Sequence, residues 1–240
     1  MMEVVCAFDT ETTGFVNPRL VELGFAIGTV SSAGTVLLHA RSLIVKPAGF
    51  DIPEESTKIH GISTARALAE GCDVSHALAA LKRACKAYGV DRIIAHNLAY
   101  DAKVMRAERD SGGGTIPLCC EVGGGAGSCT LAMARSANPG SRLGNNKLAT
   151  VHARLYGEGA GEGRAWHGAE VDAVACLEVY TGFSFHSRGS APASVPASVP
   201  ATDEEVVARV VAVAFARVSK RRAAAAAASR KRKAGVEPRL

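Results

Sequence analysis

The stretch VVCAFDTETTG, residues 4–14, places two carboxylates directly after an apolar run. The run at residues 4–8 has the length and composition of a buried β-strand. Side chains two residues apart on a strand point to the same face, so Asp9 and Glu11 are predicted to lie side by side. Two carboxylates on a buried face repel each other, and burial penalises their charged forms. We therefore expect a positively charged group between them.

Alternating strand and helix patterns over the first 186 residues predict an α/β domain. Apolar runs bounded by turn residues predict strands, and apolar residues that recur with a helical period predict helices. The predicted strands are residues 4–8, 20–30, 35–45 and 92–95. The predicted helices are residues 53–59, 74–88, 97–109, 130–137, 147–156 and 167–185. A glycine-rich segment, 111–128, is predicted to be a loop around one further short strand.

The composition changes after the domain at residues 1–186. Residues 187–201 form a Pro/Ala/Ser linker, and the alanine-rich residues 202–240 predict a basic tail that is helical or disordered. The tail carries ten Lys/Arg and four Asp/Glu, a net charge of +6, whereas the first 200 residues have a net charge of −1. This charge favours a nucleic-acid or localisation role for the tail. The alternatives are docking through its valine stripe, a membrane-surface role and a merely solvated tail.

Seven cysteines at irregular spacing predict free thiols in a reducing compartment rather than disulfides or a zinc site. The chain has no apolar run of 18 residues and no signal-peptide pattern at its N-terminus, so no membrane is expected as a partner. The predicted location is therefore intracellular. The basic clusters at residues 220–222 and 230–233 would favour the nucleus if the organism is a eukaryote.

Two further motifs carry acidic side chains beside a histidine. HNLAYD, residues 96–101, places Asp101 near the start of a helix that follows a short strand, where α/β sheets build their sites. HGAEVD, residues 167–172, places His167 and Asp172 on the last predicted helix. Because a five-residue spacing lies off one helical face, His167 is expected in a frayed first turn that leans toward the site.

Four carboxylates and one histidine together define a consistent chemistry. Oxygen ligands at this density suit hard divalent cations, Mg²⁺ or Mn²⁺. Two such ions about 4 Å apart would stabilise an in-line phosphoryl displacement. His167 would accept the proton of the attacking water, because imidazole is the side chain that exchanges protons near neutral pH. A cation between Asp9 and Glu11 would also offset the repulsion that the first motif creates.

The three motifs FDTETTG, HNLAYD and HGAEVD resemble those of the DEDDh group of 3′→5′ exonucleases in the ribonuclease H-like superfamily. That group includes the proofreading exonuclease subunit of bacterial replicative DNA polymerase. Three secondary blocks add to the resemblance, which spans residues 3–183 in the family order. These blocks are KIHGI (58–62), CTLAMAR (129–135) and KLATVHARLYG (147–157).

The resemblance implies a mixed five-stranded sheet whose first three strands are antiparallel, with helices on both faces. It implies that Asp9, Glu11, Asp101 and Asp172 bind two Mg²⁺ ions, for which Mn²⁺ would substitute, and that His167 is the general base. The implied reaction releases nucleoside 5′-monophosphates from a nucleic acid with a free 3′ end. The residues implied to bind the terminal nucleotide are Thr12, Thr13, Gly14, His60 and Asn97.

The sequence departs from the family pattern in the 111–128 segment and at Tyr100, where phenylalanine is usual. DNA is the favoured substrate, and the alternative is an RNA-trimming or oligoribonuclease-like enzyme with the same carboxylates. A polymerase or another replication or repair protein is the expected partner. A different class of function, a non-catalytic nucleic-acid-binding or polymerase-associated subunit, stays open. His96 is interpreted as a packed core histidine, and packing remains an alternative for His60.

Overall fold

The structure, a computed structural model, describes residues 2–113 and 127–185. Most of the glycine-rich segment, the linker and the basic tail lie outside the described residues. Among the described helices, none has the length and apolar character that crossing a membrane requires. Five cysteines fall in the described part of the chain, Cys6, Cys72, Cys85, Cys129 and Cys176, and none of these five is in a disulfide, as predicted.

A five-stranded mixed sheet forms the centre of the domain, with strand order β3-β2-β1-β4-β5. β1 pairs antiparallel with β2, and β2 pairs antiparallel with β3. β4 and β5 continue the sheet parallel to β1. This arrangement confirms the predicted mixed sheet with three antiparallel strands. The strands are β1 (Glu3–Thr12), β2 (Leu20–Ser31), β3 (Gly34–Ile44), β4 (Arg92–Ala95) and β5 (Gly127–Cys129).

β1 is longer than the sequence indicated. The apolar run predicted a strand that ends at Phe8, but the pairing with β2 continues to Thr12, so Asp9 and Glu11 lie within the strand. The ladder bonds to β2 override the low strand propensity of the two acidic residues. The register shifts between Glu11 and Thr12, which ends the regular pairing just after the second carboxylate.

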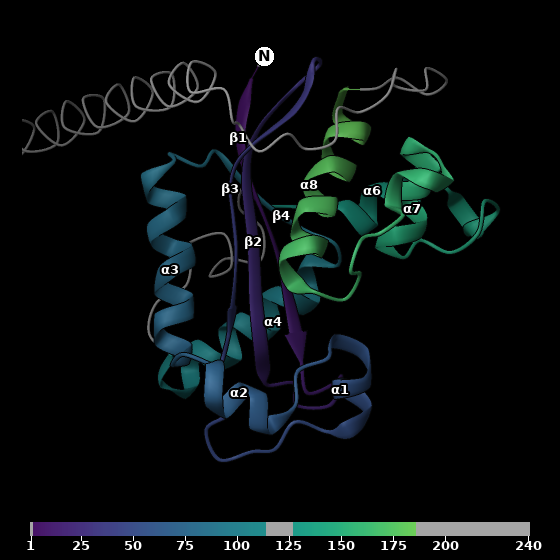
Figure 1. Ribbon diagram of the computed structural model, residues 1–240. Helices are drawn as coiled ribbons and strands as arrows, with labels where there is room; N and C mark the ends of the chain where they lie inside the picture. The colour runs from purple at the N-terminus through teal and green to yellow at the C-terminus, as the bar shows by residue number, and fades with distance from the viewer. Residues whose placement is uncertain (1, 114–126, 186–240) are drawn as a thin grey trace, which may run out of the picture. The chain divides into compact units, whose positions relative to one another are not determined.

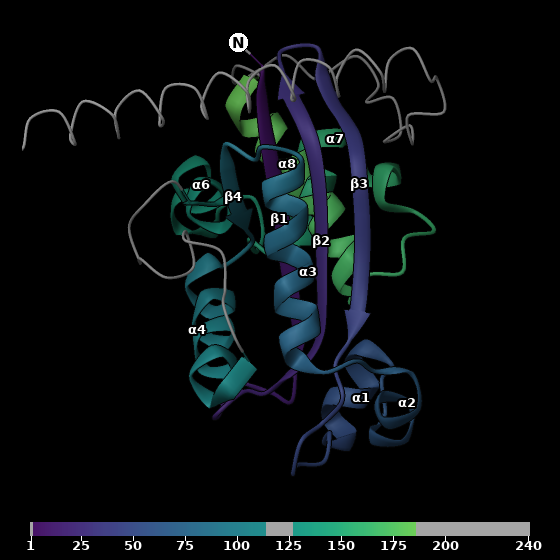
Figure 2. The same ribbon diagram turned by 90° about the vertical axis from the view of Figure 1, so that its left-hand side faces the viewer.

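Helices cover both faces of the sheet, as predicted (Figures 1 and 2). α3 and α4 pack on one face, and α8 with α6 and α7 packs on the other. α1 and α2 lie at the end of the sheet where β1 stops (Figure 1). The helices are α1 (Glu54–His60), α2 (Thr64–Glu70), α3 (Val74–Ala87), α4 (Leu98–Glu108), α6 (Thr130–Ala137), α7 (Leu148–Tyr156) and α8 (Ala169–Phe185). Three short helical turns complete them: Arg109–Gly113, Pro139–Ser141 and Glu158–Gly161.

α2 was missed by the prediction, because seven residues make only about two helical turns, too few to show a clear apolar period. Its start is nevertheless marked in the sequence. Ser63 is the N-cap, and its side chain accepts a hydrogen bond from the backbone N–H of Arg66. α2 contributes Ala67 to a small apolar cluster at this end of the sheet.

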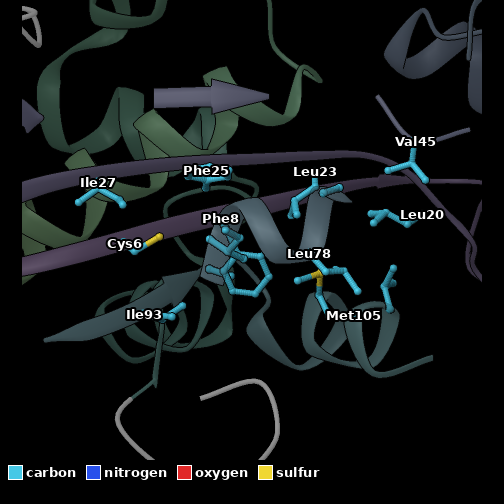
Figure 3. Packing of buried hydrophobic residues seen from close by; sticks show 14 of the residues in the cluster. Cys6, Phe8, Leu20, Leu23, Phe25, Ile27, Val45, Leu78, Ile93 and Met105 are labelled. Carbon is cyan, nitrogen blue, oxygen red and sulfur yellow. The ribbon is translucent and has the colours of Figure 1, made fainter. Parts of the chain in front are cut away.

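The two-residue period of β1 divides the core into two layers. Cys6 and Phe8 face α3 and α4, where they pack with Leu78 and Met105 (Figure 3). Val5 and Ala7 belong to the opposite layer beneath α8. This alternation fixes the face of every β1 side chain, because a one-residue slip would exchange the two layers.

α8 lies directly on β2 because two glycines leave room for it. A Cβ atom on Gly24 would overlap the backbone of Ala169 and Glu170 in the first turn of α8. A Cβ atom on Gly28 would lie 2.8 Å from the Leu177 side chain. Ten of the residues of α8 are buried, so the helix is held by packing along its length. This contact sets the height of Asp172 above the sheet.

Candidate active site

The end of β1 brings three of the predicted carboxylates together. One oxygen from each of Asp9, Glu11 and Asp172 lies within 4.8 Å of the other two. Asp9 and Glu11 come from one face of β1, and Asp172 descends from the first turn of α8. The structure thus brings the first and third sequence motifs together, although Glu11 and Asp172 are 161 residues apart along the chain.

Asp101 approaches the same strand end from the other side. It lies in the first turn of α4, is 3% exposed, and accepts a hydrogen bond of 2.8 Å from the Thr10 hydroxyl. Its negative charge raises the pKa of both Asp9 and Glu11, which shows that it acts on the same group of carboxylates. Thr10 therefore has a role that the sequence motif did not indicate, because its hydroxyl holds the carboxylate of Asp101 in place.

The four predicted carboxylates lie close together and are largely shielded from water, so their negative charges repel one another. Burial is the largest cause of the raised pKa of all four groups. With the smaller effects of neighbouring charges and hydrogen bonds, the pKa is about 8 for Glu11, about 7 for Asp101 and about 6 for Asp172. The pKa of Asp9 is raised well above its ordinary value by burial and by the charges of its neighbours, Asp101 first. Such a cluster requires protons or cations to be stable.

His167 lies outside the helix in which it was predicted. α8 begins at Ala169, and His167 is an exposed residue of the preceding loop with φ +68°. The prediction that His167 lies in a frayed first turn of the helix is therefore wrong, because a residue in the left-handed conformation cannot continue a right-handed helix. The prediction that His167 leans toward the site is supported, since the charge and the backbone N–H of His167 both lower the pKa of Asp172.

Glu22 is a fifth carboxylate at the site that the sequence prediction missed. It is 9% exposed, lies opposite Glu11 in the β1–β2 register, and accepts the backbone N–H of Ala169 at 3.1 Å. Its charge raises the pKa of Asp9, Glu11 and Asp172. A glutamate in the middle of the apolar run LVELGFAI was the signal that could have revealed it.

The last residue of β1, Thr12, and the loop after it, with Thr13 and Gly14, contain three of the residues predicted to contact the terminal nucleotide. Two hydrogen bonds of 3.0 Å close the base of this loop: the N–H of Thr13 donates to the carbonyl of Arg19, and the N–H of Arg19 donates to the Thr13 hydroxyl. The Tyr100 hydroxyl lies 2.7 Å from that of Thr12 and donates to the carbonyl of Gly14 at 2.8 Å. Tyrosine, the departure from the family pattern, thus ties this loop to α4.

His60 is brought close to the same loop, whereas Asn97 is not tied to it. The Nδ1 atom of His60 accepts the backbone N–H of Ile62 at 3.1 Å, which leaves the proton on Nε2. Nε2 is buried and has no hydrogen-bond partner among the described residues. Burial lowers the pKa of His60, and the backbone of Thr12 and the charge of Glu22 oppose that effect. Asn97 is exposed and left-handed, with φ +87°, at the start of α4.

His96 is a packed histidine, as interpreted from the sequence. Its Nδ1 atom lies 2.9 Å from the Thr130 hydroxyl, and its Nε2 atom lies 2.9 Å from the carbonyl of Asn146. Since a carbonyl can only accept, Nε2 carries the proton and Nδ1 accepts from Thr130. Both ring nitrogens are thereby used in joining β4 to α6 and to the segment before α7.

No protein-family model matches the chain, and no curated protein matches it by sequence. Solved structures do match its fold. E. coli exonuclease I in a zinc-bound complex with single-stranded DNA superposes with a TM-score of 0.56 at 18% identity. The same enzyme with a dA16 oligonucleotide gives a TM-score of 0.56, also at 18% identity. Exonuclease I from Methylocaldum szegediense gives a TM-score of 0.53 at 18% identity.

The chain has the ribonuclease H-like fold of exonuclease I. Each of these matches covers 75% of this chain but only 40% of the matched enzyme. The predicted fold is therefore confirmed for the described domain. At this level of identity, the roles of individual residues rest on their own geometry.

Proposed function

We propose that this protein is a metal-dependent 3′→5′ exonuclease that releases nucleoside 5′-monophosphates, with DNA as the favoured substrate. The observation that carries the proposal is the close approach of Asp9, Glu11 and Asp172, whose oxygens lie within 4.8 Å of one another. Asp101 adds a fourth negative charge beside them. The shared fold supports the proposal, because exonuclease I structures of that fold contain single-stranded DNA.

The residues at the strand end fit divalent cations. All candidate ligands are carboxylate oxygens, the donors that Mg²⁺ and Mn²⁺ prefer. The Oδ1 atom of Asp172 is buried and has no hydrogen-bond partner in the described part of the chain, so it is available as a ligand. Asp9, Glu11, Asp101 and Asp172 would hold the two ions. When bound, these ions supply Lewis-acid activation of the phosphodiester and of the attacking water.

The chain's own groups would perform the remaining tasks. His167, exposed beside Asp172, would take the proton from the attacking water. The backbone of Thr12, Thr13 and Gly14 would lie against the terminal nucleotide. Phe15, at the tip of the same loop, is 85% exposed and 5.8 Å from the Tyr100 ring, which makes it available to stack on a base.

A cleavage assay tests this proposal. The full-length protein is incubated with 5′-labelled DNA and RNA oligonucleotides, single- and double-stranded, in Mg²⁺, Mn²⁺ or EDTA. The expected result is a ladder that shortens from the 3′ end only when metal is present, is absent for Asp9→Asn, and is faster on DNA. A faster ladder on RNA would instead establish the RNA-trimming alternative.

The same assay addresses the non-catalytic alternative. Binding to every oligonucleotide without cleavage, in wild type and Asp9→Asn alike, would refute the exonuclease and favour a polymerase-associated subunit. Association with a replication or repair polymerase belongs to the proposal in either case, and affinity capture with the full-length chain would test it. The intracellular location remains a prediction from the lack of a membrane-span or signal-peptide pattern, and the nuclear location remains a prediction from the basic tail.

A further inference from the structure

His167 occupies a backbone conformation that its own sequence does not stabilise. A histidine with positive φ is held against a conformational penalty, and this side chain is exposed. On its C-terminal side, the chain is fixed at once, because Glu22 accepts the N–H of Ala169 and Gly24 lies against the backbone there. The N-terminal side must be fixed by other contacts, or the residue would relax.

A buried charge cluster provides that second attachment. Arg164 donates to Oε2 of Glu178 at 2.7 Å, and Nε2 of His152 lies 2.8 Å from the same oxygen. Glu178 is 2% exposed and belongs to α8, and His152 is 2% exposed and belongs to α7. The ion pair therefore joins the loop before His167 to the two helices beneath it, and water reaches only its Arg164 side, where the side chain is 21% exposed.

Trp166 extends the attachment to the residue next to His167. Its ring packs edge-on against the His152 ring, with centroids 5.9 Å apart, and lies 5.9 Å from the guanidinium of Arg164. Its backbone N–H donates to the carbonyl of Arg164 at 2.9 Å. A Cβ atom on Gly161 would lie 3.1 Å from the Trp166 ring, so the loop folds closely over the indole.

We propose that the Arg164–Glu178 ion pair, supported by His152 and Trp166, is a clamp that positions His167, and that Arg164 is a positioning residue for the reaction. This inference rests on the proposed function, in which His167 is the general base. Arg164 could also act by its charge alone, because that charge influences Asp172. The two roles are separable, because replacing Glu178 by glutamine weakens the clamp but leaves the charge of Arg164 in place.

Trp166 is the only tryptophan of the chain, so its fluorescence reports on this loop without labelling. We expect Arg164→Gln and Glu178→Gln each to red-shift its emission and to increase its quenching by acrylamide. The matched control is Arg154→Gln, an arginine of α7 that donates instead to Asn145 and Asn146. Its emission should equal that of the wild type. Unchanged emission in both clamp variants would overturn the clamp, whatever the activity of the protein.

Kinetics distinguish positioning from charge. Arg164→Gln and Glu178→Gln should both lower kcat by about 10- to 100-fold with little change in KM, since small displacements of a catalytic group have effects of this size. In the His167→Ala background, neither change should slow the reaction further. Positioning would be refuted if only Arg164→Gln lowered kcat. It would also be refuted if the substitutions lowered kcat in the His167→Ala background as much as in the wild type. A wild type without nuclease activity would refute the proposed function, and the clamp would then be decided by Trp166 emission.

Discussion

Replacing Glu11 by glutamine should stabilise the metal-free protein at neutral pH, even though it should destroy the site. Burial and the charges of Asp172, Glu22 and Asp101 raise the pKa of Glu11 from its ordinary value of 4.5 to about 8. The folded protein therefore binds a proton more tightly at this position than the unfolded chain does. The contribution of Glu11 to the free energy of unfolding is greatest below pH 4.5 and is lost as the pH rises to 8.

The size of the effect follows from the two pKa values. Because of this difference in pKa, the carboxyl group of Glu11 lowers the free energy of unfolding relative to a group that stays neutral in both states. The loss is about 4 kcal/mol at pH 7.5 and about 1 kcal/mol at pH 5. Glutamine keeps the shape of the side chain and removes the charge, although its buried amide still loses contact with water. We therefore expect Glu11→Gln to raise the free energy of unfolding by about 2 to 4 kcal/mol at pH 7.5 and by less than about 1 kcal/mol at pH 5.

Urea unfolding in EDTA, followed by circular dichroism at both pH values, measures the difference directly. Mg²⁺ at more than one thousand times its Kd should reverse the order of stability, because the ion stabilises only a folded state that binds it, by about 4.1 kcal/mol at one thousand times its Kd. Glu54→Gln is the control, since Glu54 is an exposed residue of α1 that pairs with Lys58. A Glu11→Gln protein that is less stable than the wild type at pH 7.5 in EDTA would refute the electrostatic reasoning.

Five further substitutions test the assignment of roles. Asp9→Asn, Asp101→Asn and Asp172→Asn should each abolish turnover almost completely, and a wild-type rate in any of them would remove that residue from the ligand set. His167→Ala should slow cleavage by about 10²- to 10⁴-fold while oligonucleotide binding is kept, and an unchanged rate at neutral pH would indicate another base. Tyr100→Phe removes the hydroxyl that ties the loop after β1 to α4. It should raise KM more than it lowers kcat and should cost about 1 to 3 kcal/mol in urea unfolding, and unchanged values would show that the loop needs no such tie.

The sequence predicted the strands and helices that have a clear apolar period, and it failed where tertiary contacts decide. The strand β4 and the helix α6 have the predicted bounds, because their patterns are short and sharply delimited. β1 was predicted too short, since pairing with β2 carries it through two acidic residues that disfavour strands. The backbone at His167 was mispredicted because its conformation depends on contacts with residues far away in the chain.

The candidate site was predicted as a set of residue types rather than as a geometry. Two-residue spacing on a strand is enough to place Asp9 and Glu11 together, and the structure bears this out. The glutamate inside the apolar run LVELGFAI marked Glu22 as unusual, but the local pattern could not show that it lies opposite Glu11. Nor could spacing reveal that Arg164 and Glu178 meet, since they lie 14 residues apart on a loop and a helix.

Glu22 and Gly24 explain why the two halves of the site keep a fixed separation. Both lie on one face of β2, where Glu22 holds the first N–H of α8 and Gly24 admits the helix backbone. Glu22 is also the register partner of Glu11. The pairing of β1 with β2 therefore fixes the position of Glu11 relative to the start of α8, and hence to Asp172. A metal site that depends on oxygens within 4.8 Å is in this way built on strand register, which backbone hydrogen bonds hold more rigidly than any loop contact would.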